Sequence, residues 1–173
     1  EVDMANHFDG ANREYVIEDM FPRRDWLNYL WNGNTVLCLT QFGDGNAFTN
    51  LGSTNRQIDA GVRYLYVRNR KNGKYWAMNR NFNQENFDRF ECHVGIGYHT
   101  IISEVDGIHA ELTFMVPMVG RVVMVKAVVT NVLKETLPLD ITFVCHPTVV
   151  MGPHTSYGEG HKEEGMNALL YTY

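Results

Sequence analysis

Carboxylates and histidines are the side chains of this 173-residue sequence with the chemistry for catalysis. Glu91, Glu104 and Glu111 each lie in a strand-like segment, and a pair of carboxylates flanking a glycosidic bond is the usual machinery of glycoside cleavage. The sequence does not place any two of them at the separation that this reaction needs, and acids on a solvated strand face are far more common. A Gly-x-Ser-x-Gly nucleophile elbow does not occur either. We therefore assign no catalytic residue.

The seven histidines are the next candidates, because imidazole nitrogens are common metal ligands. His93 and His99 lie six positions apart across a glycine turn, and the sequence contains no His-x-His or Glu-x-x-His pair. His146, His154 and His161 are spaced by eight and seven residues in loop-like sequence. Surface or hydrogen-bonded histidines explain this pattern better than ligands do. We predict no metal site and no protein-bound cofactor.

Aromatic side chains offer a third kind of chemistry, because 12% of the residues are aromatic. A flat ring with a polar edge stacks well against the apolar face of a pyranose. Aromatics in a β-rich chain more often fill the core, so each candidate has to be weighed against that role. The aromatic set is Trp26, Tyr29, Trp31, Tyr64, Tyr66, Tyr75 and Trp76. From it we select Trp31, Tyr66 and Trp76 as candidate carbohydrate contacts.

Short runs of β-branched and aromatic residues, separated by glycine and asparagine, predict the strands that must position these side chains. Asn72-Gly73 between two aromatic runs is the strongest hairpin signal, because both residues tolerate a positive φ. We expect a polar loop between Thr49 and Tyr64. An apolar segment covers residues 26–31, and the expected strands cover residues 14–17, 35–40, 47–49, 64–68, 75–78, 90–94, 98–105, 108–116, 122–131 and 139–147.

Period-two alternation is clearest in residues 108–116, where every second side chain from Ile108 to Val116 is apolar. We expect the next two strands to continue this inner face through Val123, Val125, Ala127 and Val129, and through Leu139, Ile141, Phe143 and Cys145. A sheet with one apolar face needs a second sheet to cover it. The sequence therefore predicts an all-β fold, an antiparallel two-sheet β-sandwich that spans residues 1–173 as a single domain.

Composition argues against two classes of partner. A formal net charge of −5 leaves no basic surface to neutralise phosphates, so we expect no nucleic-acid partner. No run approaches the roughly 18 apolar residues of a membrane span, so we expect no membrane partner. Cys38, Cys92 and Cys145 are widely spaced and odd in number, so a disulfide would leave one unpaired. Free thiols in a reducing compartment fit this pattern, and we expect a cytoplasmic location.

Several segments taken together are more specific than any one of them. They are residues 13–17, 22–33, 63–68 and 72–76, followed by 90–98 with its Gly-Ile-Gly-Tyr, 103–108 and 114–117. In this order they resemble the start of cellobiose phosphorylase and its relatives, glycoside hydrolase family 94. The resemblance runs from about residue 9 to residue 150, nearly the whole chain.

The resemblance implies a galactose mutarotase-like supersandwich at the N-terminus of a longer inverting phosphorylase. In that family an (α/α)₆ barrel carries the general acid and binds inorganic phosphate, the co-substrate, and no residue of this chain matches those positions. We therefore expect a chain that is inactive alone and serves homodimer assembly and active-site shaping in a glycosyltransferase acting on a β-linked disaccharide or oligosaccharide. One alternative is a free-standing carbohydrate-binding or structural β-sandwich, and another is an independent enzyme on a mutarotase-like sandwich.

Overall fold

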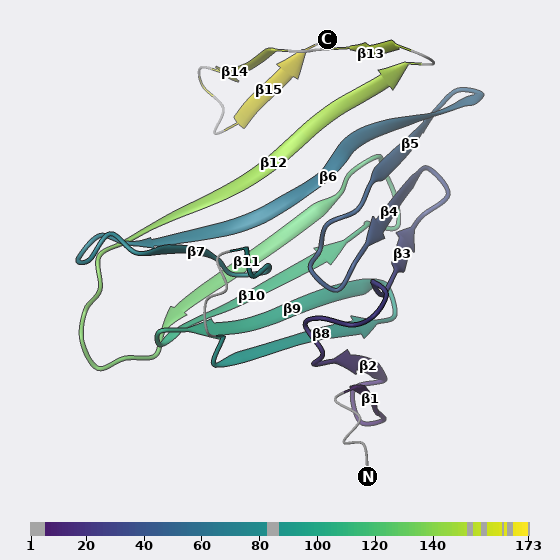
Figure 1. Ribbon diagram of the computed structural model, residues 1–173. Coiled ribbons are helices and arrows are strands. Elements are labelled where there is room, and N and C mark those ends of the chain that lie inside the picture. The colour runs from purple at the N-terminus through teal and green to yellow at the C-terminus, as the bar shows by residue number, and fades with distance from the viewer. Residues whose placement is uncertain are drawn as a thin grey trace.

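The computed structural model describes residues 6–82, 87–151, 154–156, 159–163, 165 and 168–172. These residues form fifteen strands and no helix. The strands make two large sheets and a separate pair, β14 (Glu159–Glu163) with β15 (Ala168–Thr172), and all of the pairings are antiparallel (Figure 1). The predicted all-β fold with two antiparallel sheets is therefore confirmed. The extent of the single domain, 1–173, stays a prediction because parts of it lie outside the described residues.

Sheet A contains six strands in the order β1-β2-β8-β9-β10-β11. Their bounds are β1 Asn6–Asp9, β2 Glu14–Ile17, β8 Arg89–Gly95, β9 Tyr98–Val105, β10 Ile108–Met115 and β11 Met124–Asn131. The strands β8 to β11 are consecutive in sequence and form an antiparallel meander, in which short turns join β8 to β9 and β9 to β10. In the turn between β9 and β10, Asp106 and Gly107 both have positive φ, as an Asp-Gly hairpin turn requires.

Sheet B contains β13-β12-β6-β5-β4-β3, with the short β7 also paired to β6. The bounds are β3 Asn28–Trp31, β4 Thr35–Leu39, β5 Ala47–Leu51, β6 Thr54–Asn69, β7 Tyr75–Ala77, β12 Leu139–Met151 and β13 His154–Ser156. The hairpin predicted at Asn72-Gly73 is present between β6 and β7, and Gly73 has a φ of 76°.

The prediction of a polar loop before Tyr64 is wrong, because β6 already begins at Thr54 and runs for 16 residues. Its first half pairs with β5 and with the far end of β12, so backbone hydrogen bonds hold it on both sides. Polar side chains are compatible with such a strand because the ladder uses main-chain groups. The strand β1 was also not expected from the sequence, and it lies at the edge of sheet A.

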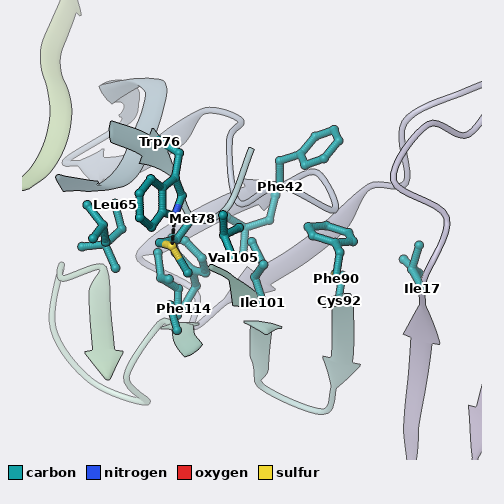
Figure 2. Packing of buried hydrophobic residues seen from close by; sticks show 14 of the residues in the cluster. Ile17, Phe42, Leu65, Trp76, Met78, Phe90, Cys92, Ile101, Val105 and Phe114 are labelled. Carbon is teal, nitrogen blue, oxygen red and sulfur yellow. Dashed lines mark hydrogen bonds between the residues drawn. The ribbon is translucent and has the colours of Figure 1, made fainter. Parts of the chain in front are cut away.

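The hydrophobic core lies between the inner faces of the two sheets (Figure 2). Sheet A contributes the alternating side chains of β9 and β10, among them Ile101, Leu112 and Phe114, which are fully buried. Trp76 from β7 and Leu65 from β6 pack against them from sheet B. Burying each of these large side chains contributes roughly 1.5–3 kcal/mol, so this interior is the main stabilising feature of the sandwich.

Two glycines allow the loop after β4 to lie directly on β6. Gly45 and Gly61 have φ values of 122° and 87°, and the Gly45 amide donates a hydrogen bond to the Gly61 carbonyl at 3.3 Å. A Cβ on Gly61 would lie 3.0 Å from the backbone nitrogen of Gly45, and a Cβ on Gly45 would lie 2.5 Å from the carbonyl oxygen of Cys38. The two main chains can therefore approach this closely only without side chains.

One side of the sandwich is not covered, and we call it the open margin: Ala127 of β11 with Ile141, Phe143 and Cys145 of β12. Ile141 and Phe143 pair with the buried Val67 and Leu65, so they lie on the inner face as predicted. They are nevertheless 52% and 41% exposed, because β12 packs mainly on its neighbours β6 and β13 within the described residues. The predicted inner face is therefore present on β12, but at the open margin nothing among the described residues covers it.

Candidate functional site

A hollow lies on the outer face of sheet B, and we call it the aromatic groove. Its volume is about 710 Å³, within the range of small-molecule sites. Trp31 and Val36 are exposed there, whereas their neighbours Leu30 and Leu37 point into the core, as strand alternation requires. The groove is lined by Trp31, Gly33, Asn34, Val36, Phe48, Thr49, Asn50, Asn55, Arg56 and Gln57.

The floor of the aromatic groove is a row of side chains that crosses four strands. Trp31 of β3 is opposite Val36 of β4, Val36 is opposite Phe48 of β5, and Phe48 is opposite Gln57 of β6. Side chains directly opposite one another on one face lie about 4.5–5.5 Å apart at Cβ. The row is therefore a continuous, mostly apolar strip that ends in an amide.

The polar residues around this strip differ in how they are bonded. The Gln57 side chain donates to the carbonyl of Asp59 at 3.1 Å, and the Thr49 hydroxyl donates to the carbonyl of Asn34 at 3.2 Å. By contrast, four polar side chains of the lining have no hydrogen-bond or ion-pair partner anywhere in the described ranges: those of Asn34, Asn50, Asn55 and Arg56. Donors and acceptors around the groove are thus free for a ligand.

The three predicted carbohydrate contacts do not come together. Trp31 lies in the aromatic groove and is 71% exposed. Tyr66 is half-buried on the outer face of β6, between Thr142 and Ala77, and does not line the groove. Trp76 is only 1% exposed, and its indole Nε1–H donates to Sδ of Met78 at 2.8 Å in the core. The selection of Trp76 was wrong in physical terms, because a ring enclosed on both faces cannot stack on a sugar.

Phe48, Asn50 and Arg56 were not predicted from the sequence to be part of a site. The register of β5 and β6 places Phe48 and Asn50 on the same face as Trp31, and this register shifts between Ala47 and Phe48. A shift of this kind changes which side chains share a face. The one sequence signal for this groove was strand alternation, which puts Trp31 and Val36 on the same face on either side of the Asn32-Gly33 turn.

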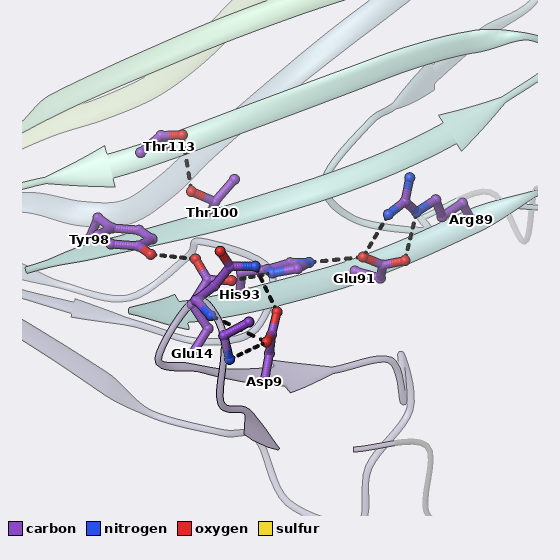
Figure 3. Close-up of polar contacts among 10 residues, drawn as sticks. Asp9, Glu14, Arg89, Glu91, His93, Tyr98, Thr100 and Thr113 are labelled. Carbon is purple, nitrogen blue, oxygen red and sulfur yellow. Dashed lines mark hydrogen bonds and ion pairs between the residues drawn. The ribbon is translucent and has the colours of Figure 1, made fainter. Parts of the chain in front are cut away.

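The outer face of sheet A carries a different arrangement, a chain of ion pairs and hydrogen bonds (Figure 3). Arg89 of β8 binds Glu91 through Nε and Nη2 at 2.6 and 2.9 Å. Glu91 is 2.8 Å from Nε2 of His93, and Nδ1 of His93 is 2.7 Å from Glu14 of β2. The Tyr98 hydroxyl donates to the same Glu14 carboxylate. These contacts tie β2, β8 and β9 together.

His93 is placed to be an imidazolium ion. Both ring nitrogens face a carboxylate oxygen, and only the protonated ring carries a hydrogen on each. Burial opposes the charge, but the hydrogen bonds that the ring donates to Glu14 and Glu91 outweigh it and raise the pKa of His93 above its ordinary value. The ring therefore links Glu14 of β2 to Glu91 of β8.

The carboxylates considered for glycoside chemistry share this outer face. Glu111 lies 3.2 Å and Glu104 3.9 Å from His109. The hydrogen bond from Arg89 lowers the pKa of Glu91, and that from His93 lowers it further. A general acid for glycoside cleavage needs the opposite shift. For Glu91 the structure thus indicates an ion-pair role.

His99 shows the contrary behaviour on the inner face of β9. It is almost fully buried, with Nε2 at 3.2 Å from Sγ of Cys92 and Nδ1 at 3.5 Å from the Asn28 amide. Burial lowers the pKa of His99 to about 4, so the ring is neutral near pH 7. Burial also raises the pKa of the Cys92 thiol, so this cysteine is unreactive at the same pH.

A second hollow, of about 400 Å³, lies among the loops that follow β2, β4 and β7. Its polar groups are already paired. Gln41 donates to Asp25 at 3.2 Å and accepts from the Trp26 amide, while Arg80 is ion-paired with Asp44. This hollow is therefore a weaker candidate for ligand binding than the aromatic groove.

Metal and membrane sites were also considered. Among the described residues, no three His, Cys, Asp or Glu side chains gather in a way that could hold a metal ion. No helix in the described ranges has the length and apolar character needed to cross a membrane. The absence of a metal site in the whole chain stays a prediction.

Comparison with known proteins now adds to this geometry. The chain is 28% identical over 121 residues to an N,N'-diacetylchitobiose phosphorylase from Vibrio proteolyticus, covering 64% of this chain and 15% of the relative. It is 26% identical over 159 residues to a 3-O-beta-D-glucopyranosyl-beta-D-glucuronide phosphorylase from Paenibacillus borealis, covering 91% of this chain and 20% of the relative. A solabiose phosphorylase from the same organism is 27% identical over 115 residues.

These relatives are much longer than the chain, which matches only 15–20% of their length. A family model described as the supersandwich domain of glycosyl hydrolase 94 matches residues 13–157. The match includes the two large sheets except β1, and it ends before β14. With most of its length matched, and with the two-sheet architecture that the family name describes, the chain belongs to the glycosyl hydrolase 94 supersandwich domain family.

Proposed function

We propose that this chain is the non-catalytic N-terminal domain of an inverting disaccharide phosphorylase, which transfers a glycosyl group to inorganic phosphate. The observation that carries the proposal is the family match over residues 13–157 in a chain that corresponds to 15–20% of relatives named as phosphorylases. In this proposal the chemistry belongs to residues outside 1–173, and the domain assists in homodimer assembly and in shaping the substrate site.

The open margin supports a role in assembly. Ile141 and Phe143 expose apolar surface on an inner sheet face, and a soluble protein normally covers such a surface. The segment that joins β11 to β12 carries further exposed apolar groups, Val132 and Leu133. We propose that another part of the phosphorylase packs here, so that the domain is held firmly against the rest of the enzyme.

The ion pairs on sheet A support the assignment of catalysis elsewhere. Glu91 is bound by Arg89 and His93, and its pKa is lowered, whereas proton donation to a leaving sugar oxygen needs a carboxyl group that stays protonated near neutral pH. In this role Glu91 holds strands together and does not contact substrate.

The test is phosphorolysis by the full-length gene product. The enzyme is incubated with inorganic phosphate and either cellobiose or N,N'-diacetylchitobiose, and sugar 1-phosphate is measured by NMR, which also gives the anomer. We expect the α-anomer from a β-linked substrate with the full-length enzyme and no product with the 173-residue chain alone. Product formation by the chain alone, or hydrolysis without phosphate consumption by the full-length enzyme, would contradict the proposal.

A further inference from the structure

We infer that the aromatic groove is a binding site for an uncharged saccharide chain, which lies across β3, β4, β5 and β6 on the outer face of sheet B. This goes beyond the proposed function, because the site is complete within this chain and involves no bond cleavage. Its elements are an apolar strip and a rim of polar side chains, and none of the described residues that line it is acidic.

The strip has the shape that a chain of sugar rings needs. Trp31, Val36 and Phe48 follow one another on adjacent strands, and Gln57 ends the row. Three strand spacings of about 4.8 Å give a row of about 14 Å, longer than a single pyranose ring. Trp31 is the most exposed member, so its ring face is the anchor on which one sugar stacks.

The rim supplies the hydrogen bonds that hydroxyl groups require. The side-chain amides of Asn34, Asn50 and Asn55 each offer donors and an acceptor, and Arg56 adds donors. None of the four has a side-chain partner in the part of the chain that the structure describes. A polyhydroxylated ligand matches such a mixture, because each hydroxyl both donates and accepts.

The same rim argues against the other possible occupants. A protein surface laid over the groove would bury three amides and a guanidinium, and each one left unpaired would cost free energy. A nucleic acid would need several cations, and Arg56 is the one basic residue among the described residues of the lining. A cationic ligand would find no carboxylate among the same residues. An uncharged saccharide avoids all three difficulties.

The experiment measures binding to the 173-residue chain itself. Cellotetraose and tetra-N-acetylchitotetraose are titrated separately by calorimetry, and backbone amide shifts are followed by NMR. We expect saturable binding of at least one of the two, with shifts centred on Trp31, Phe48 and Asn50. Replacing the anchor in Trp31→Ala should weaken binding at least about tenfold, and Asn50→Ala should weaken it by a smaller factor.

Tyr75→Ala is the matched control, because Tyr75 is an exposed aromatic of sheet B that does not line the groove. It should leave the affinity unchanged. Trp31→Phe should retain part of it, which separates loss of the ring from loss of folding.

Several results would overturn the inference: no saturation with either sugar, equal affinity for wild type and Trp31→Ala, or a dimer in sedimentation experiments that Trp31→Ala dissociates. The phosphorolysis assay on the full-length enzyme is independent of these outcomes, so the two proposals can fail separately.

Discussion

The strands β10 and β12 have similar alternating sequences but very different surroundings. Phe114 on β10 is fully buried, whereas Phe143 on β12 is 41% exposed although it too lies on an inner face. Phe114 packs between sheets, with Gly43 and Ile101 beside it. Alternation therefore fixes the direction of a side chain, while burial depends on whether the opposite sheet extends far enough to cover it.

The largest effect that this comparison predicts concerns the two phenylalanines. Phe114→Ala should lower the free energy of unfolding by about 3–5 kcal/mol, because it removes a ring from a closed core and leaves a cavity. Phe143→Ala should lower it by less than about 1 kcal/mol, because much of its ring is already in water. Urea denaturation of the 173-residue chain measures both values. Equal losses for the two variants would show that the open margin is closed in solution.

A second prediction concerns how the stability of the closed core, where His99 lies, depends on pH. Because the pKa of His99 is about 4 in the folded chain and about 6.5 in an unfolded chain, the unfolded state binds a proton first as the pH falls. The free energy of unfolding should therefore decrease below pH 6.5 by roughly 1.4 kcal/mol per pH unit, to a total of about 3 kcal/mol near pH 4. Denaturant titrations at several pH values measure this slope, and His99→Gln should remove it.

A third, smaller effect has the opposite sign and belongs to the outer face of sheet A. The raised pKa of His93 means that its contribution to stability is complete below its unfolded pKa and is lost as the pH rises through the folded value. His93→Gln should abolish this alkaline loss and leave the acid loss from His99 intact. NMR titration of the ring protons gives both pKa values directly. A His93 pKa below about 6.5 would remove the basis for this prediction.

A fourth prediction concerns the reactivity of the cysteines in the two regions, for which we expect the smallest effect on stability. Cys145 is exposed at the open margin, and Cys92 is buried beside His99. Native protein should therefore react with a thiol reagent at Cys145, slowed by the burial that raises its pKa, and at Cys92 only after unfolding. Peptide mass spectrometry identifies the labelled residue, with Cys145→Ser as the control. Rapid labelling of Cys92 would indicate that the core opens locally.

Much of the fold could be predicted because it depends on local signals. The alternation from Ile108 to Phe114 and the Asn72-Gly73 turn each act over a few residues, and both predictions are confirmed. The strand at Thr54 could not be found this way, since pairing on both sides stabilises it despite its polar sequence. The exposure of Phe143 depends on how far sheet A reaches, which no pattern within β12 contains.

The candidate site was predictable only in part for a similar reason. Trp31 was selected for its aromatic ring, and the structure does place it in the groove. Trp76 was selected on the same ground, but its partner Val67 faces the core, and so does the indole. Phe48 joins Trp31 through the strand register, which links distant parts of the sequence and shifts next to Phe48. Residue type identifies a possible contact, and the register decides which contacts share a surface.

The contact between Gly45 and Gly61 should also restrict which substitutions evolution accepts at these two positions. A mutation that adds a side chain at Gly61 places its Cβ against backbone atoms of Gly45. Because the clash is with the backbone, a second mutation at Gly45 cannot relieve it. Among homologous genes we therefore expect the two glycines to be retained or lost together, with loss accompanied by an insertion or deletion in the loop after β4.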